Sequence, residues 1–418
     1  MRKQTTCLIL LVSLFVSTLP ALVHFPVVRA WNGTIYIYSD GSVNPPSAPI
    51  HQNGNVYTLT DNIVTADDGI IIERNSTIFD GNGYTIQGSS SGNGIDMSQT
   101  NYVTVKNTKL QDFNIGIFAP KSNYDTVLGN TIAQNSYLGI YVDGSSDDDI
   151  IANNIQQNSY GVWLTTSSNN NIYHNNFVNN AVQVYTDSMN TWDFGYPVGG
   201  NYWSDYAGSD LYSGPSQDQT GSDGIGDSPY IIDVNNVDNY PLISPLIHDI
   251  GITDVSASKT IVGQGLAMNV SVQVVNYGVQ TETFSVTLNV SSTIINTWTK
   301  TLSPQTSELL NYTWTTSGIS KGNYTISAYA PPVSGETLTA DNNFTGGWVI
   351  VSLIGDLTGS TPFVPDGKVD IRDIAVVAKC FGSVPGASNW NANCDLNNDG
   401  KIDIKDIAMV AKHYGQSG

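Results

Sequence analysis

Gly139-Ile140-Tyr141-Val142 is the clearest copy of a short pattern that the chain repeats between residues 94 and 186. The other copies are Gly94-Ile95-Asp96-Met97, Gly116-Ile117-Phe118-Ala119, Gly161-Val162-Trp163-Leu164 and Gln183-Val184-Tyr185-Thr186. The second residues of successive copies lie 22, 23, 22 and 22 positions apart. A fixed period of this length is typical of a solenoid in which each repeat forms one coil. Because a repeat is too short for a strand and a helix, we expect a right-handed parallel β-helix with strands ~4.8 Å apart.

Side chains alternate between the two faces of a strand, so the second and fourth residues of each copy should fill the coil. The third residues should point outward and stack from coil to coil: Phe118, Tyr141, Trp163 and Tyr185. Aromatic faces in a row can stack on a polysaccharide, which makes this column the candidate ligand-binding surface. The alternative is stacking that only stabilises the sheet, or cover by Trp192, Tyr202 and Trp203.

Asparagines share the period of the strands. They form two rows, Asn130, Asn153 and Asn175, and Asn135, Asn158 and Asn180. Stacked amides can satisfy buried polar groups at turns by bonding along the solenoid, so we expect two asparagine ladders.

The first 30 residues are typical of a secretory signal, with Arg2-Lys3, an apolar run from Cys7 to Leu19, and Val28-Arg29-Ala30. We therefore expect an extracellular protein, secreted or attached to the cell surface, with no membrane span in the mature chain. The formal net charge of −20 argues against a nucleic-acid partner. Glycosylation sequons agree with export and predict a glycoprotein where the host modifies them: Asn32, Asn75, Asn269, Asn289, Asn311, Asn323 and Asn343.

Residues 31–246 should hold the β-helix and its C-terminal cap. After the last repeat come Asn201-Tyr202-Trp203-Ser204-Asp205-Tyr206, Asp223-Gly224-Ile225-Gly226-Asp227 and Asn239-Tyr240-Pro241-Leu242. Together with the repeats, these motifs resemble the NosD-like β-helix family. The resemblance implies this fold and an exported accessory role linked to copper.

Copper sites use Cys, Met or His ligands. Between residues 31 and 246 such residues are His51, His174, Met97 and Met189, and they do not cluster in sequence. We therefore predict no copper site.

Residues 247–352 alternate Val, Ser and Thr with apolar residues in short runs separated by turns, which predicts an Ig-like β-sandwich. The opening His248–Val255, the turn Val274–Gly278 and the late Asp341-Asn342-Asn343 resemble the CARDB module. The resemblance implies a spacer or adhesive domain without catalytic activity.

Residues 353–418 carry two copies of one motif, Asp366–Gly382 and Asp399–Gly415, identical at 12 of 17 positions. The second copy completes a loop of the EF-hand type with Gly400 at the sharp turn. Its expected calcium ligands are Asp395, Asn397, Asp399, the carbonyl of Lys401, Asp403 and Asp406. Ca²⁺ takes six to eight oxygen ligands at such spacings. A helix should follow, with Ile407, Val410 and Tyr414 on one face.

The first loop departs from this pattern. It has six extra residues near Ser360–Pro365 and Thr358 at the usual Asn position. Its expected ligands are Asp356, Asp366, the carbonyl of Lys368, Asp370 and Asp373, which can converge only if the insertion loops out.

Two such half-motifs resemble a type I dockerin. The resemblance implies a small α-helical, EF-hand-like domain that binds Ca²⁺ and a cohesin-like or other docking protein. Family members often recognise the docking partner through two hydroxyl-bearing residues just before the last calcium ligand of each loop. Here those positions hold Ile371-Arg372 and Ile404-Lys405, which leaves the class of partner open.

Cys380 and Cys394 remain after removal of the signal and lie fourteen positions apart in an exported chain, which predicts a disulfide.

Two functions fit these features. The first is a non-enzymatic modular surface protein whose β-helix binds or scaffolds a carbohydrate or protein, attached through the calcium-dependent tail. The alternative is a polysaccharide lyase or glycoside hydrolase of the β-helix type, for which Asp96, Asp143 and Asp147–Asp149 are the carboxylates nearest the aromatic column. No catalytic residue set is evident.

Overall fold

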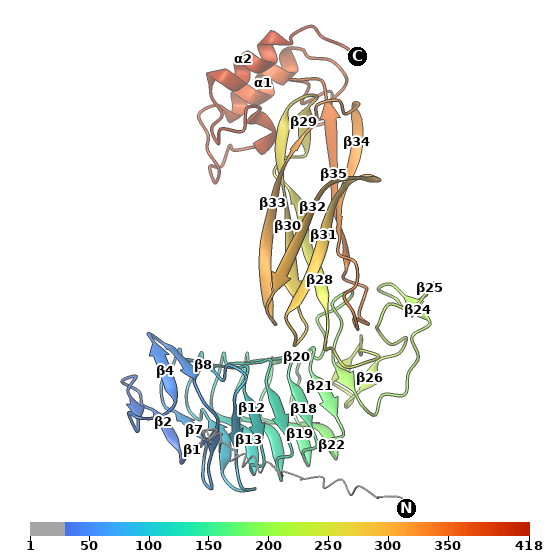
Figure 1. Ribbon diagram of the computed structural model, residues 1–418. Coiled ribbons are helices and arrows are strands. Elements are labelled where there is room, and N and C mark those ends of the chain that lie inside the picture. The colour runs from blue at the N-terminus through green and yellow to red at the C-terminus, as the bar shows by residue number, and fades with distance from the viewer. Residues whose placement is uncertain (1–29) are drawn as a thin grey trace, which may run out of the picture.

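The computed structural model describes residues 30–418, so the predicted signal lies almost entirely outside the described part. Three parts follow one another along the chain (Figure 1): a β-helix, a sandwich that rises from its C-terminal coils, and a small helical tail at the far end of the sandwich. No helix among the described residues is long and apolar enough to cross a membrane.

The β-helix has three faces, each an almost entirely parallel sheet with one strand from each coil. Sheet A has the order β1 (Trp31–Asn32), β6 (Ile63–Val64), β9 (Thr85–Gln87), β12 (Lys109–Gln111), β15 (Thr131–Ala133), β18 (Asn154–Gln156), β21 (Asn176–Val178) and β23 (Tyr202–Trp203). Sheet B has the order β22 (Val182–Thr186), β19 (Tyr160–Thr165), β16 (Leu138–Asp143), β13 (Ile115–Pro120), β10 (Asn93–Asp96), β7 (Ile70–Ile72), β2 (Ile35–Ile37) and β3 (Val43–Asn44). Sheet C has the order β20 (Asn171–Tyr173), β17 (Asp149–Ile151), β14 (Thr126–Leu128), β11 (Thr104–Lys106), β8 (Ile78–Asp80), β5 (Val56–Leu59) and β4 (Ile50–Asn53).

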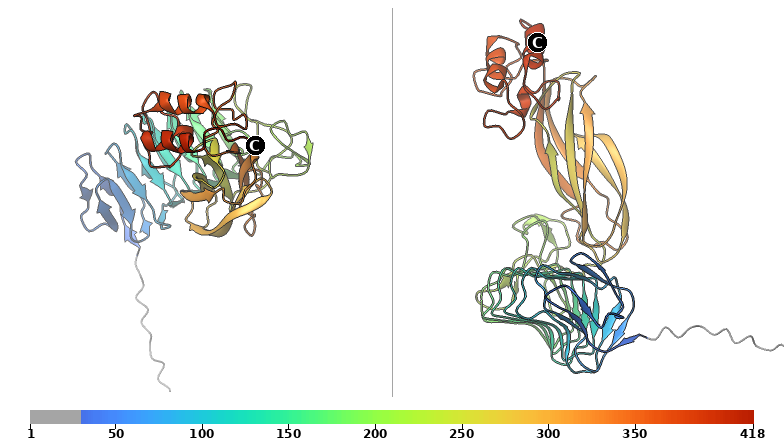
Figure 2. Two further views of the ribbon diagram at one scale, coloured as in Figure 1. Left: turned by 90° about the horizontal axis from the view of Figure 1, so that it is seen from above. Right: turned by 90° about the vertical axis from the view of Figure 1, so that its left-hand side faces the viewer.

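The repeat sets the register, as expected. Ile95, Ile117, Ile140, Val162 and Val184 pair in succession across sheet B. The first four of these are fully buried, and the right-hand view in Figure 2 shows the coils superposed along the axis. A Cβ on Gly116 would lie 2.5 Å from the carbonyl oxygen of Gly139. Glycine therefore recurs at the start of the pattern because the next coil leaves no room for a side chain.

Both predicted asparagine ladders are present. In each ladder, the side-chain oxygen of one Asn accepts the backbone N–H of the ladder residue one coil earlier. Asn153 accepts from Asn130 at 2.9 Å, and Asn175 accepts from Asn153 at 3.0 Å. In the second row, Asn158 accepts from Asn135, and Asn180 from Asn158, each at 3.0 Å.

A third ladder was not expected from the sequence. Asp125 and Asp148 begin it, and Asn170 and Asn190 continue it with the same coil-to-coil bonds. Burial raises the pKa of Asp125 to about 6 and that of Asp148 to about 8. Asp148 is thus part of a buried turn and does not face the aromatic column.

The cap closes the end of the solenoid with short hairpins and two buried tryptophans. Its remaining strands are β24 (Tyr212–Ser213), β25 (Gln219–Thr220), β26 (Tyr230–Ile231) and β27 (Val237–Asp238). Trp203 stacks on Phe177 of the last coil with ring centroids 4.4 Å apart, and its indole N–H donates to Asp238 at 2.8 Å. Asp238 also accepts the N–H of Asn201, so the first ladder runs on into the cap. Trp192 and Trp203 therefore cover the core rather than the aromatic column.

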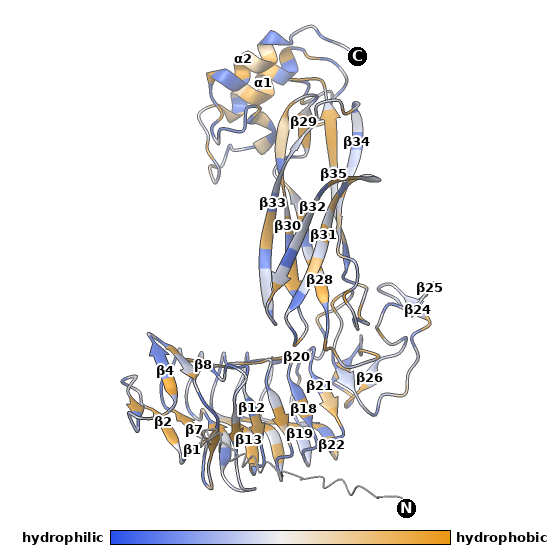
Figure 3. Cartoon of the chain, in the orientation of Figure 1, coloured by the Kyte–Doolittle hydropathy of each residue, from blue (hydrophilic) through white to orange (hydrophobic). Residues whose placement is uncertain are grey.

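The sandwich consists of two sheets around one apolar core. One sheet has the order β28 (Ile250–Ala257), β30 (Ala267–Asn276) and β33 (Thr306–Thr315). The other has the order β29 (Ile261–Gly263), β35 (Asn343–Ser352), β34 (Gly322–Tyr329), β31 (Glu282–Val290) and β32 (Thr293–Leu302). Figure 3 shows hydrophobic residues (orange) and hydrophilic residues (blue) along the strands of the sandwich.

The tail contains α1 (Ile371–Cys380), a 3₁₀ turn (Ala392–Cys394) and α2 (Ile404–Lys412). Asp370 and Asp403 cap the two helices, each with a capping box completed by the Asp three residues later. The helix expected after the second loop ends before Tyr414, which is exposed, because the chain turns at His413.

We predict that Asn153→Ala lowers the free energy of unfolding of the β-helix by about 2–4 kcal/mol, because it leaves buried backbone groups of two neighbouring coils without partners. Its amide nitrogen also donates to the carbonyls of Val127 and Ile151. Urea unfolding measures the change. Asn154→Ala is the control, since that side chain forms no hydrogen bond within residues 30–418 and should cost less than about 0.5 kcal/mol. Equal losses in the two variants would contradict the role of the ladder.

The base of the sandwich holds two buried carboxyl groups. Burial, followed by the charge of Glu336, raises the pKa of Asp341 to about 8, and burial together with the charge of Asp341 raises that of Asp249. The folded state therefore holds protons that the unfolded chain releases near pH 4. Stability from these groups is present below pH 4 and is lost as the pH rises towards 8.

We accordingly expect the sandwich to be less stable at pH 8 than at pH 5.5. The measurement is the protection of the amides of β28 and β30 against hydrogen exchange, in a buffer that contains EDTA. The double variant Asp249→Asn/Asp341→Asn should remove most of this dependence, whereas Asp254→Asn, which alters an exposed carboxylate in β28, should leave it unchanged. A wild-type sandwich whose protection does not change across this pH range would contradict the assignment.

Candidate functional site

The two loops of the tail have the same hydrogen-bond pattern despite the insertion in the first. In the second loop the N–H groups of Asp399 and Gly400 donate to Asp395 at 3.2 and 3.0 Å. Asp406 accepts from Leu396 and from Asp403, both at 2.9 Å. These bonds bring the two ends of the loop together.

In the first loop, Asp356 accepts from Asp366 and Gly367 at 3.2 and 3.0 Å. Asp373 accepts from Leu357 and Asp370, both at 2.8 Å. The six extra residues bulge outward, with a local turn in which Val364 N–H donates to Thr361. Asp356 and Asp366 thus occupy the places of Asp395 and Asp399.

A basic side chain pairs with the carboxylates of each loop. Arg372 Nη2 lies 2.7 Å from Asp366 and 2.5 Å from Asp370, and Lys405 Nζ lies 3.0 Å from Asp399. These ion pairs hold Asp366 and Asp370 of the first loop and Asp399 of the second against a basic side chain. Within residues 30–418, no three His, Cys, Asp or Glu side chains gather closely enough to hold a metal ion.

The donors of the loops nevertheless suit Ca²⁺, because all are oxygens and each loop has four carboxylates but, among the residues that the structure describes, only one basic side chain that pairs with them. Burial, followed by the charges of Asp373 and Asp366, raises the pKa of Asp356 to about 6. Burial also raises the pKa of Asp395. A divalent cation would offset this repulsion.

The second loop is fixed against the sandwich. Asn393 Oδ1 accepts the N–H groups of Thr260 and Ile261 at 3.0 and 2.9 Å. The buried Lys259 ammonium donates to the carbonyl oxygen of Asp395. These contacts, which the sequence did not indicate, attach the tail to the edge at β29.

Cys380 and Cys394 are two buried free thiols whose sulfur atoms lie 2.9 Å apart. The structure therefore does not contain the predicted disulfide, although it brings both residues together at the C-terminal end of α1. The bond stays a prediction.

The aromatic column lies on sheet B. Phe118, Tyr141, Trp163 and Tyr185 are paired in register on successive coils. The rings of Phe118 and Tyr141 stack at 5.4 Å, and those of Trp163 and Tyr185 lie 4.2 Å apart. Tyr185 is 41% exposed.

Two further members of this surface were not expected from the sequence. Tyr160 packs edge-on against Trp163 at 4.8 Å, and Tyr137 lies 6.3 Å from Trp163. Their spacing of 23 residues is the signal that could have revealed them. The six rings form the aromatic patch of sheet B.

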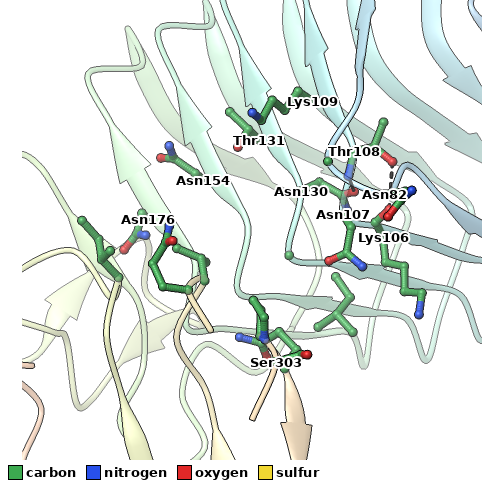
Figure 4. Close-up of a pocket in the computed structure, with 18 of the residues that line it drawn as sticks. Asn82, Lys106, Asn107, Thr108, Lys109, Asn130, Thr131, Asn154, Asn176 and Ser303 are labelled. Carbon is green, nitrogen blue, oxygen red and sulfur yellow. Dashed lines mark hydrogen bonds between the residues drawn. The ribbon is translucent and has the colours of Figure 1, made fainter. Parts of the chain in front are cut away.

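A cleft of about 840 Å³ separates the β-helix from the loops at the base of the sandwich. The β-helix side is the edge between sheets C and A, and Ser303–Thr306 and Val279-Gln280 line the opposite wall. Figure 4 shows Lys109, Thr131 and Asn154 in a row on one side and Ser303 on the other. We call this space the junction cleft.

Comparisons with known proteins agree with the two ends of this architecture. Residues 26–208 match the family described as periplasmic copper-binding protein (NosD), and residues 364–413 match the dockerin type I domain. The chain joins a NosD-like β-helix to a type I dockerin segment. No curated protein matches it.

Solved structures similar to parts of the chain share little sequence with it. A CARDB domain from Pyrococcus furiosus, in complex with di-metal ions, is 23% identical over 25% of this chain and 89% of that one, with a TM-score of 0.22. A β-glucosidase from Listeria innocua is 10% identical over 29% of this chain and 19% of that one (TM-score 0.20). A type II cohesin–X–dockerin complex from Acetivibrio cellulolyticus is 20% identical over 32% and 83% (TM-score 0.14).

The predicted disulfide can be tested in the full chain purified without reductant. We expect oxidised material to be about 3 kcal/mol more stable in its tail than reduced material, the effect of closing a 15-residue loop. Thiol labelling after denaturation, with and without prior reduction, measures the state of the two cysteines. Full labelling without reduction would show that both remain free.

Proposed function

We propose that this chain is an extracellular, calcium-dependent docking protein that presents a glycan-binding β-helix at a distance from its attachment point. The observation that carries the proposal is the shared hydrogen-bond pattern of the two tail loops, which gives both copies the loop closure that calcium binding requires. The match of residues 364–413 to the dockerin type I domain supports it. Under this proposal the tail binds two Ca²⁺ ions and a cohesin-like partner.

The docking face would include the first residues of the two helices. Ile371 and Ile404 are 63% and 66% exposed, and each is followed by the basic residue that pairs with its loop. Exposed isoleucines at matching positions favour a partner with an apolar contact surface. The hydroxyl pairs typical of the family are absent there.

The β-helix would bind a polysaccharide through the aromatic patch of sheet B. Its rings are partly exposed and are not covered by the cap tryptophans, and the four rings of the column lie in register. Flat sugar faces stack on such rings at little cost in side-chain entropy.

Calcium removal tests the docking role. We expect EDTA to lower the melting temperature of the tail by at least about 4 °C, the shift that roughly 1 kcal/mol produces in a domain of this size. It should also abolish binding to a panel of type I cohesin domains. Asp395→Ala/Asp406→Ala should reproduce both effects in the presence of calcium.

Two variants sharpen this test. Asp218→Ala, which removes an exposed cap carboxylate, should change neither property. Ile371→Asp/Ile404→Asp should keep the calcium-dependent melting but lose the partner. A tail that melts at the same temperature with and without EDTA would refute the calcium assignment.

Glycan binding can be measured on a polysaccharide panel with Tyr141→Ala/Trp163→Ala. We expect this variant to lose about tenfold or more in affinity, since each stacked ring contributes roughly 1 kcal/mol or more. Tyr102→Ala/Tyr124→Ala is the matched control, because these rings also stack, at 5.0 Å, but lie outside the patch. Release of reducing ends or unsaturated uronides in the same samples would instead favour the lyase or glycosidase.

A further inference from the structure

We propose that the junction cleft binds a short acidic oligosaccharide whose chain runs parallel to the axis of the β-helix. This inference rests on the proposed glycan-binding function and assigns it a second site, on a different face from the aromatic patch. It also names the chemical class of the ligand.

The size and place of the cleft fit a bound oligosaccharide. Its volume of about 840 Å³ lies within the range of small-molecule sites, roughly 300–1,000 Å³, which often occur where two domains meet. It follows the β-helix from Asp80 in β8 to Val178 in β21, so it crosses five consecutive coils. Five coils spaced ~4.8 Å apart give a floor roughly 19 Å long.

One row of polar side chains on this floor can form hydrogen bonds with a ligand. Lys109, Thr131 and Asn154 are the first residues of β12, β15 and β18 and are paired in register. Because Leu110 and its equivalents point into the core, these three side chains point outward into the cleft. None of them forms a side-chain hydrogen bond or ion pair within residues 30–418. Ammonium, hydroxyl and amide groups repeated once per coil can meet the alternating donors and acceptors of a sugar chain.

The charge of the cleft favours an acidic sugar. Residues 31–246 contain four cationic side chains, and two of them, Lys106 and Lys109, line the cleft. Lys106 is paired with Asp80 at 3.3 Å, whereas Lys109 is exposed and has no anionic partner among the described residues. Lys106 and Lys109 outnumber Asp80, the one carboxylate that the described part of the chain contributes to the lining of the cleft, although the chain as a whole has a formal charge of −20. A uronate carboxylate there would gain a charge-assisted hydrogen bond from Lys109.

The walls of the cleft are held in place before any ligand arrives. Asn176 accepts from the N–H of Leu246 at 2.8 Å and donates to its carbonyl at 3.3 Å, which ties the β-helix to the segment entering the sandwich. Gln305 donates to the carbonyls of Tyr277 and Gly278 and so fixes the loop of the opposite wall. A preformed cleft loses little entropy on binding.

The test is calorimetric titration of the full chain with tetragalacturonate and with its methyl ester, which has the same backbone without the charges. Calcium-free buffer is used because calcium itself bridges uronates. We expect saturable binding of the acid and weaker binding of the ester. Lys109→Ala should weaken binding of the acid about tenfold or more, and Asn154→Ala should weaken binding of both probes.

Two controls separate binding in the cleft from binding elsewhere on the chain. Lys121→Ala removes an exposed lysine outside the cleft and should leave the affinity for the acid unchanged. Trp163→Ala alters the aromatic patch and reports any binding of the acid there. Equal losses in Lys109→Ala and Lys121→Ala would reveal general charge attraction and overturn the proposal. An ester that binds as tightly as the acid would overturn the acidic class.

The same experiments distinguish an error in the cleft assignment from an error in the proposed glycan-binding function. The ligand would lie on the aromatic patch if binding survives Lys109→Ala and Asn154→Ala but is lost in Trp163→Ala. This result would overturn the cleft assignment and leave the proposed function intact. If neither tetramer binds, the cleft assignment is overturned. If the polysaccharide panel also shows no binding, the glycan-binding function is overturned with it.

Discussion

Buried amide groups that bond from one coil to the next are the interaction on which this molecule depends. In three rows of turns the β-helix places backbone N–H groups where water cannot reach them, and an Asn or Asp one coil later accepts each of them. The first ladder continues through Asn201 to Asp238, which also holds the indole of Trp203. The same bonds therefore order the coils, attach the cap and fix the strand edges that form the floor of the junction cleft.

The period of the sequence was sufficient to predict the strands, the inward residues and two of the ladders, because a solenoid repeats one local environment. Ile95, Ile117 and Ile140 occupy equivalent positions, so one alignment places them all. The third ladder was missed because its acceptor changes from Asp to Asn along the row. Tyr137 and Tyr160 were not expected because they lie just before the four-residue repeat that begins at Gly139 and Gly161.

Contacts between domains could not be predicted in the same way. The bonds of Asn393 to Thr260 and Ile261 join residues more than 130 positions apart and follow no repeat. The junction cleft likewise arises only when loops of the sandwich meet the edge of the β-helix. In the tail, by contrast, the spacing of the acidic residues did indicate how both loops close, since local backbone bonds fix the positions of Asp356 and Asp395.

The sandwich is attached to the β-helix at its last coils, where Asn176 holds Leu246. The coils nearer the N-terminus therefore extend from this joint as a free arm (Figure 1). Gain or loss of one whole repeat in that arm would preserve every in-register bond and leave the joint untouched. Duplication of a single unit in the gene would thus lengthen the arm by one coil, about 4.8 Å, so its reach can evolve in discrete steps without a new fold.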